Sequence, residues 1–145
     1  MYNTIIRMVP YRMEAEDLLQ DSFIKVFNSI SDFQGRSTIG AWIKSICVNT
    51  CLKHLRKSGD LKFTNEESIP EPKEEESFEY DVALIHNAIK TLPKGARMIV
   101  NLFLIEGYAH SEIAQILNIS ESTSKSQYAR GKKLLAQNLK GLIYE

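Results

Sequence analysis

Long apolar runs are missing from this chain of 145 residues. A membrane-spanning helix needs roughly 18 consecutive apolar residues, and no stretch approaches that length. The opening residues, MYNTIIRMVPYRMEAEDLL, lack an apolar core followed by a small-residue cleavage site, so they match a secretory signal peptide poorly. The sequence therefore predicts a globular protein of the cytoplasm, with no membrane insertion.

Cysteine is scarce as well, since Cys47 and Cys51 are the only 2 in the chain. Their spacing of four residues places them on one face of a helix, and His54 extends that face. No fourth metal ligand is evident, and the paired CxxC units of a zinc site are absent. We interpret the pair as small buried thiols rather than as part of a metal site, and we expect no cofactor.

The sequence also lacks the parts of a catalytic centre. Its 3 histidines, His54, His86 and His110, fall in different segments. Neither a nucleophile near them nor a glycine-rich phosphate-binding loop is apparent, so an enzyme is not expected.

Net charge is absent too, because 18 Lys and Arg balance 18 Asp and Glu. Their distribution is uneven: residues 1–58 carry 8 basic and 5 acidic side chains, residues 59–80 carry 2 and 8, and residues 81–145 carry 8 and 5. Two basic blocks therefore flank an acidic segment. This pattern keeps nucleic acid among the candidate partners despite the neutral total.

What the chain does contain is helical periodicity. It predicts an amphipathic helix over residues 15–30 and, after a turn at Gly35, a second helix over about 38–57 that Ser37 caps. The apolar face of the first helix is predicted to comprise Leu18, Leu19, Phe23, Val26, Phe27 and Ile30. That of the second is predicted to include Ile39, Trp42, Ile43, Ile46 and Leu55, with Trp42 in the core.

Residues 59–77, GDLKFTNEESIPEPKEEES, have two prolines and repeated glutamates, with little to bury. This composition predicts a flexible acidic linker. The expected fold class is all-α, with two small helical domains at residues 1–58 and 78–145 on either side of the linker.

The second half ends in a pattern typical of a helix-turn-helix. ARMIVNLFLIEG is apolar nearly all round, which predicts a buried central helix that Gly107 ends. A short helix follows over 111–117, then a tight turn with Asn118 in the left-handed conformation and Ser120 as the cap of the next helix.

The helix from Glu121 has an inward line at Ser124, Tyr128, Gly131 and Leu135. Larger apolar residues at Ser124 and Gly131 are expected to pack better, which predicts modest stability. Its small and basic outward residues suit base edges and phosphates: Ser122, Lys125, Ser126, Ala129, Arg130 and Lys133. A solvated basic surface helix is the simpler alternative.

Two stretches resemble a known family. The segment LPKGARMIVNLFLIEGYAHSEIAQILNISESTSKSQYARGKKLL resembles the domain with which bacterial extracytoplasmic-function sigma factors bind the minus-thirty-five promoter element. The segment AEDLLQDSFIKVFNSISDFQGRSTIGAWIKSICVNTCLKHLRK resembles their domain for the minus-ten element. The resemblance implies a transcription initiation factor whose partners are core RNA polymerase, promoter DNA and an anti-sigma factor.

The resemblance also implies residue roles. A polymerase-docking surface is expected at Asp17, Gln20, Asp21 and Phe23. A pocket for a flipped base of the non-template strand is expected at Ser29, Phe33 and Asn49. Contacts with the DNA backbone are expected at Lys53, Arg56 and Lys57, and groove-reading contacts at Lys125, Ser126, Ala129 and Arg130.

Some positions depart from the family pattern. The family usually has a further helix and a half before MYNTIIRM, so a truncated start is expected. Ala109 replaces a common capping serine, and Gln127 replaces a common arginine, which implies the loss of one phosphate contact.

Two other functions stay open at this point. One is a regulator with a LuxR-like helix-turn-helix that binds operator DNA without polymerase. The other is a truncated remnant that only binds an anti-sigma partner.

Overall fold

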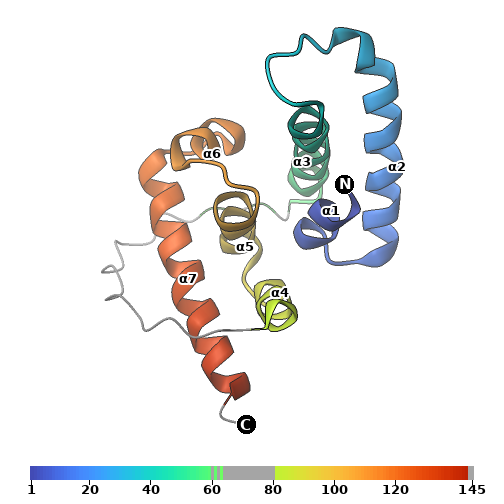
Figure 1. Ribbon diagram of the computed structural model, residues 1–145. Helices are drawn as coiled ribbons and strands as arrows, with labels where there is room; N and C mark the ends of the chain where they lie inside the picture. The colour runs from blue at the N-terminus through green and yellow to red at the C-terminus, as the bar shows by residue number, and fades with distance from the viewer. Residues whose placement is uncertain (60, 62, 64–80, 144–145) are drawn as a thin grey trace. The chain divides into compact units, whose positions relative to one another are not determined.

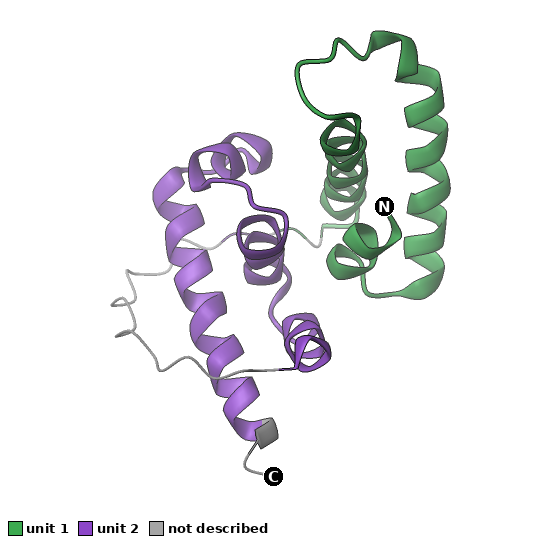
Figure 2. Ribbon diagram, viewed as in Figure 1, with its two compact units in different colours: residues 1–61 green, residues 62–145 purple. Residues whose placement is uncertain are grey.

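The computed structural model describes residues 1–59, 61, 63 and 81–143 (Figure 1). The regular elements in these ranges are all helical, and none of the helices is long and apolar enough to cross a membrane. The chain divides into two compact units, Met1–Leu61 and Lys62–Glu145 (Figure 2). The all-α prediction is therefore confirmed. Nearly all of the predicted acidic linker lies outside the described residues, and the predicted domain boundaries stay predictions.

Unit 1 consists of α1 (Tyr2–Met8), α2 (Arg12–Ser29), the short 3-10 helix η1 (Ile30–Asp32) and α3 (Ile39–Lys57). Helices α2 and α3 pack along each other, and α1 packs on both. The largest buried apolar side chains are Ile5, Met8, Val9, Leu18, Val48, Leu52 and Leu55. Cys47 and Cys51 are fully buried within the same core, which confirms their interpretation as buried thiols.

The predicted apolar faces of α2 and α3 are only half correct. Phe27 is 72% exposed and Ile39 is 50% exposed, while Trp42 is only half-buried. The buried residues of α3 begin only at Cys47. The reason is that α1 lies at the end where α2 begins, so among the described helices of this unit no third helix covers the opposite end (Figure 1).

The start of α3 also differs from its prediction. Thr38 is the cap, because its hydroxyl oxygen accepts a hydrogen bond from the Ala41 amide at 3.2 Å. The Ser37 hydroxyl instead donates to the Thr38 carbonyl at 3.2 Å. The predicted boundary was close, but the wrong one of two adjacent hydroxyl residues was chosen.

Unit 2 contains α4 (Val82–Lys90), α5 (Lys94–Val100), the π-helical turn η2 (Asn101–Ile105), α6 (His110–Leu117) and α7 (Glu121–Ile143). The long helix α7 packs against α4, α5 and α6. The predicted central helix is confirmed, with fully buried side chains at Met98, Ile99, Val100 and Leu102. It ends before Gly107, whose φ of +78° requires glycine-like freedom. The π-helical turn was not predicted.

Gly131 sets how closely α7 approaches α5. A Cβ atom at this position would lie 2.6 Å from Val100 Cγ2 and 3.5 Å from Ala96 Cβ. Ser124, one of the other inward positions, is fully buried beside His110. At Gly131 the prediction that a larger apolar residue would pack better is therefore wrong, because Val100 leaves no volume for it.

Candidate nucleic-acid interface

The turn between α6 and α7 has helix-turn-helix geometry. Asn118 adopts the left-handed conformation with φ 54° and ψ 49°, and its amide bonds to the carbonyls of Ala114 and Gln115. Asparagine tolerates this conformation better than other residues with a side chain, apart from aspartate. The Ile119 amide also donates to the Ala114 carbonyl at 3.0 Å. The predicted tight turn is therefore confirmed.

Hydroxyl groups organise the first turn of α7. Ser120 Oγ accepts from the Thr123 amide at 3.0 Å, which confirms Ser120 as the cap. The same oxygen lies 2.7 Å from Thr123 Oγ1 and 3.0 Å from Ser122 Oγ. Ser126 Oγ donates to the Thr123 carbonyl at 3.0 Å. By contrast Ala109, before α6, provides no side-chain cap, as its departure from the family pattern implied.

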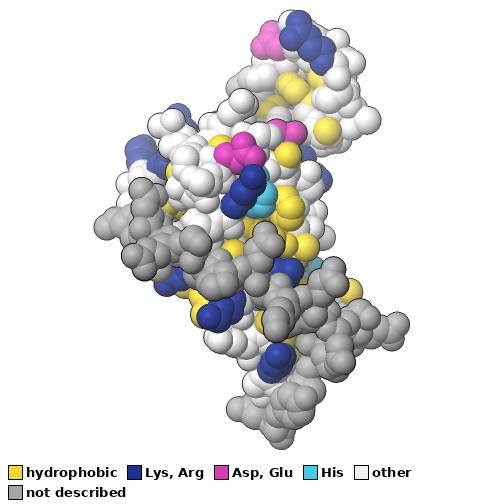
Figure 3. Space-filling model, turned by 90° about the vertical axis from the view of Figure 1, so that its left-hand side faces the viewer, with side chains coloured by type: hydrophobic (Ala, Val, Ile, Leu, Met, Phe, Trp, Pro, Cys, Tyr) yellow, Lys and Arg dark blue, Asp and Glu magenta, His cyan; other side chains and the backbone are white. Residues whose placement is uncertain are grey.

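The predicted outward residues of α7 lie on its accessible surface. Ser122, Lys125 and Lys133 are exposed, whereas Ser126, Ala129 and Arg130 are half-buried. Figure 3 presents one face of the molecule, on which Lys and Arg side chains occur at several separate places. Gln127 is only 4% exposed, so the prediction that it marks a lost phosphate contact is wrong. Its position faces the protein interior.

His110 joins α6 to α7 in a way that the sequence analysis missed. Its ring stacks on Phe103, with centroids 4.3 Å apart and planes at 13°, and it meets the edge of Tyr128 at 5.5 Å. Its Nδ1 lies 2.8 Å from Ser124 Oγ. Burial lowers the pKa of His110, and the nearby charge of Lys125 acts in the same direction, whereas Glu121 opposes them. A neutral imidazole therefore helps to position α7.

The predicted base pocket of unit 1 is partly assembled. The Phe33 ring lies 5.3 Å from the Trp42 ring at an angle of 51°. Trp42 is thus a half-buried support for Phe33 rather than the core residue that was predicted. Asn49 is exposed on α3, two helical turns beyond Trp42 and close to the same face. Ser29 ends α2 and is half-buried, and no hydrogen bond among the described residues links Ser29 or Asn49 to the loop that carries Phe33.

The predicted docking residues Asp17, Gln20, Asp21 and Phe23 are all exposed on α2. They adjoin an apolar stripe, which comprises Phe23, Ile24, Phe27 and Ile30. The inward positions predicted for Phe23, Phe27 and Ile30 are therefore wrong. An exposed stripe of this kind is typical of a protein-binding surface.

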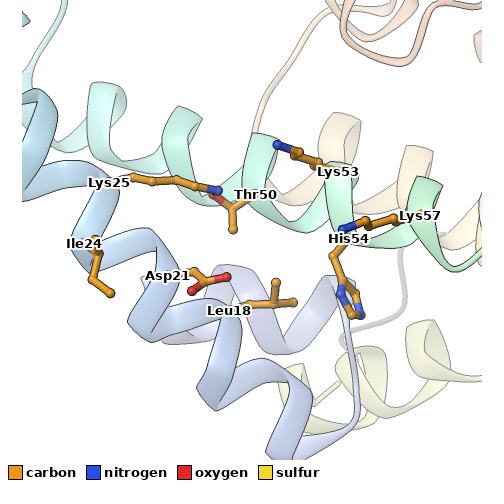
Figure 4. A pocket seen from close by; sticks show the side chains of 8 residues that line it. All are labelled: Leu18, Asp21, Ile24, Lys25, Thr50, Lys53, His54 and Lys57. Carbon is orange, nitrogen blue, oxygen red and sulfur yellow. The ribbon is translucent and has the colours of Figure 1, made fainter.

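A cavity of about 400 Å³ lies between α2 and α3, and we call it the α2–α3 groove (Figure 4). Its lining residues are Leu18, Asp21, Ile24 and Lys25 from α2, and Thr50, Lys53, His54 and Lys57 from α3. Lys25 Nζ reaches across the groove and donates to Thr50 Oγ1 at 3.1 Å. Lys53 and Lys57, two of the three predicted backbone contacts, line this groove, but Arg56 does not. The third cation, Lys25, was not predicted.

Comparison with known proteins gives two family matches. Residues 1–60 match sigma-70 region 2, and residues 83–135 match sigma-70 region 4. The RNA polymerase sigma-H factor of Pseudomonas aeruginosa is 28% identical, over 97% of this chain and 81% of that protein. The ECF RNA polymerase sigma factor SigX of Bacillus subtilis is 27% identical, over 100% of this chain and 80% of that protein.

A solved structure has the same fold. It is the sigma factor RpoE of Bartonella quintana, crystallised in complex with the anti-sigma factor NepR, with a TM-score of 0.65 and 24% identity. The match covers 96% of this chain and 89% of that chain. The two region matches occur in the order found along the chain and together span more than half of it. This chain therefore belongs to the sigma-70 family, within its extracytoplasmic-function group.

Proposed function

We propose that this chain opens promoter DNA by capturing a flipped base of the non-template strand in the pocket of unit 1. As a sigma factor it directs RNA polymerase to promoters, and it is an initiation factor without enzymatic activity. In the proposal α2 docks on core polymerase, α7 reads the minus-thirty-five element, and the face of α3 with Phe33 holds the base. A polymerase-independent regulator is set aside, because residues 1–60 match sigma-70 region 2.

The observation that carries the proposal is the packing of Phe33 on Trp42, with ring centroids 5.3 Å apart. Removing a base from the duplex costs a few kcal/mol, so the protein must offer it a stacking surface and hydrogen-bonding groups. Trp42 restrains the ring of Phe33, which reduces the entropy that Phe33 loses when a base stacks on it. Asn49, exposed two turns further along α3, offers both a donor and an acceptor.

For the partners beyond polymerase and promoter DNA, we propose regulation by an anti-sigma factor. The support is the solved relative, which was crystallised with the anti-sigma factor NepR. The exposed apolar stripe of α2 offers a surface that such a regulator can cover in competition with polymerase. We also propose the cytoplasm as the compartment, since a sigma factor acts where polymerase and chromosome meet.

The proposal is tested with Phe33→Ala and Asn49→Ala in run-off transcription with core polymerase. Loss of a stacking partner costs about 1–3 kcal/mol per base, so promoter opening should fall by roughly 5-fold to 150-fold. Permanganate reactivity of unpaired thymines measures the opening. Docking on polymerase and binding to duplex minus-thirty-five DNA should persist, because the pocket engages a base only after it leaves the stack.

Asn3→Ala, an exposed asparagine on α1, is the matched control and should open DNA normally. Circular dichroism checks that each variant keeps its helices. If both pocket variants open promoters as well as the control does, with their fold intact, the proposed base capture is wrong.

A further inference from the structure

The α2–α3 groove brings together cations from two helices to which the family resemblance gave different roles. Helix α2 was expected to dock on polymerase, yet its Lys25 faces Lys53 and Lys57 of α3 across the groove (Figure 4). The three lysines outnumber the one carboxylate in the lining, Asp21. A concave surface lined mainly by one sign of charge concentrates the electrostatic field and attracts an anion.

Lys25 is held in place rather than free to move. Thr50 Oγ1 donates its own proton to the Ile46 carbonyl at 2.8 Å, which leaves its lone pair to accept from Lys25 Nζ at 3.1 Å. An ammonium group has three protons, so Lys25 keeps two for a ligand. The Lys25 side chain therefore loses less entropy on binding than an unrestrained lysine would.

Among the described residues, the three groove lysines have no carboxylate within ion-pair distance. Two ion pairs of this unit join Arg12 with Glu16 at 2.9 Å and His54 with Glu14 at 3.4 Å. Neither involves the three groove lysines. Leu18 and Ile24 add apolar surface to the same lining, against which a sugar can pack. The ligand that this combination suits is a phosphodiester with its attached sugar, which is the repeating unit of a nucleic-acid backbone.

We propose that the α2–α3 groove binds a backbone phosphate of promoter DNA, and that Lys25 is a phosphate contact beside Lys53 and Lys57. This inference rests on the proposed function, because it requires promoter DNA to pass along α3. It gives α2 a DNA contact beside its apolar stripe: the two surfaces share Ile24, whereas Phe23, Phe27 and Ile30 lie outside the groove lining and remain available to polymerase. Asp21 lies at the groove and opposes the phosphate through its charge.

The test measures binding of the polymerase holoenzyme to forked promoter DNA as a function of salt. Lys25→Ala should reduce the slope of log K against log salt by about one, which corresponds to roughly a threefold smaller loss of affinity between 50 and 200 mM salt. Lys25→Arg should restore the slope. Arg12→Ala removes an exposed cation of the same helix outside the groove, so it is the matched control and should leave the slope unchanged.

A positional readout separates a phosphate contact from a structural role. Single phosphates of the promoter strands are replaced in turn by neutral methylphosphonates. A methylphosphonate at one position should weaken DNA binding by the unsubstituted holoenzyme several-fold. The same methylphosphonate should not affect the Lys25→Ala holoenzyme, because that contact is already lost. Asp21→Asn, tested with saturating core polymerase, should tighten DNA binding, since it removes the opposing charge.

Three results would overturn the proposal. In the first, each methylphosphonate weakens DNA binding by the Lys25→Ala holoenzyme as much as it weakens binding by the unsubstituted holoenzyme. In the second, Lys25→Ala changes the slope no more than Arg12→Ala does. In the third, Lys25→Ala binds DNA normally but loses a stabilisation by inorganic phosphate in thermal unfolding, which would assign the groove to a free anion. All three leave run-off transcription intact, whereas absence of run-off transcription from the unsubstituted chain refutes the proposed function and this inference with it.

Discussion

Two exposed lysines of α7, both predicted to contact DNA, lie in different surroundings. Lys125 Nζ lies 3.2 Å from Glu121 Oε1, one turn closer to the start of the helix. An exposed pair of this kind contributes little stability and is easily exchanged for a stronger partner. Lys133 is two turns further along and has no carboxylate partner in the described part of the chain. Only Lys125 belongs to the first turns, which in helix-turn-helix proteins meet base edges.

We therefore predict different effects from removing the two side chains. Lys125→Ala should cost about 1–3 kcal/mol on the preferred minus-thirty-five sequence and relax specificity at one base pair. Lys133→Ala should weaken binding to all sequences alike and reduce the salt slope by about one. Holoenzyme binding to a panel of single-base promoter variants measures both effects. Equal, sequence-independent losses from the two variants would reduce α7 to a basic surface helix.

His110 makes the stability of unit 2 depend on pH. Its pKa in the folded protein is lowered from 6.5, chiefly by burial. Between the folded pKa and 6.5 the unfolded chain therefore binds more protons than the folded one. Stability is full above this window, decreases as the pH falls through it, and stays reduced below it.

The measurement is urea unfolding of the full chain followed by the helix signal, at several values from about pH 5 to pH 8. His110→Gln removes the titrating group and should flatten the acid side of the curve. His86→Gln, on α4, is the control. An unchanged curve for His110→Gln would show that other groups cause the pH dependence.

At the scale of elements, the contact between α5 and α7 depends on a missing side chain. Gly131→Ala should destabilise the protein, because the new Cβ would lie 2.6 Å from Val100 Cγ2. Val100 is β-branched and stiff within its helix, so it cannot easily turn away. Overpacking costs about 1–3 kcal/mol, which exceeds the gain of about 1 kcal/mol from replacing a helical glycine.

Gly141→Ala is the internal comparison for this prediction. Gly141 lies in the same helix, and no atom comes within 4 Å of the Cβ that would be added there. This variant should gain up to about 1 kcal/mol from helix propensity alone. Denaturant midpoints give both values. Should Gly131→Ala prove as stable as Gly141→Ala, α7 and α5 would be able to separate without penalty.

How far the sequence predicts each element depends on what the element contacts. Periodicity located α2, α3, α6 and α7, and turn chemistry located Asn118 and Ser120, because these signals are local. The buried face of α3 was predicted less well, since it depends on where α1 stops covering it. Gly131 was misjudged because the volume beside it is set by α5, and the contact of Ser124 with His110 was not predicted because it joins two helices.

The candidate site follows the same division. The accessible positions at the basic end of α3 and along the outer face of α7 could be predicted from sequence, since each set lies within one helix. The position of Lys25 in the groove was not predicted, because it depends on the pairing of α2 with α3, which places Lys25 Nζ 3.1 Å from Thr50 Oγ1. Trp42 was misjudged for a similar reason, since only the folded loop brings Phe33 onto it.

At the scale of the whole molecule, the proposed function requires two DNA elements to be bound together. Unit 1 contains the match to region 2, and unit 2 contains the match to region 4. Binding at one element raises the effective concentration of the other contact, which adds a factor of about 10² to 10⁴ in affinity when both can be reached. That gain disappears when geometry prevents simultaneous binding.

We therefore predict a strong dependence on promoter spacing. Inserting about five base pairs between the two elements rotates one by half of a turn of about 10.5 base pairs. Run-off transcription should fall by about 10²-fold or more, and inserting a full turn should not restore it completely, because the distance has also changed. Promoters with either element scrambled are the controls. Transcription that is indifferent to spacing would mean that the two units do not act together.

The reactivity of the two buried thiols reports how often unit 1 opens. Both cysteines and the single tryptophan of the chain lie in unit 1. Burial raises the pKa of Cys51 to about 12, and alkylating reagents attack the thiolate, so modification must await local or global opening of this unit. The rate of thiol labelling therefore measures the opening of unit 1, and Trp42 fluorescence provides a second probe of the same unit. Neither signal comes from the residues of unit 2. If promoter DNA or polymerase slows the labelling of these thiols, the added partner stabilises unit 1.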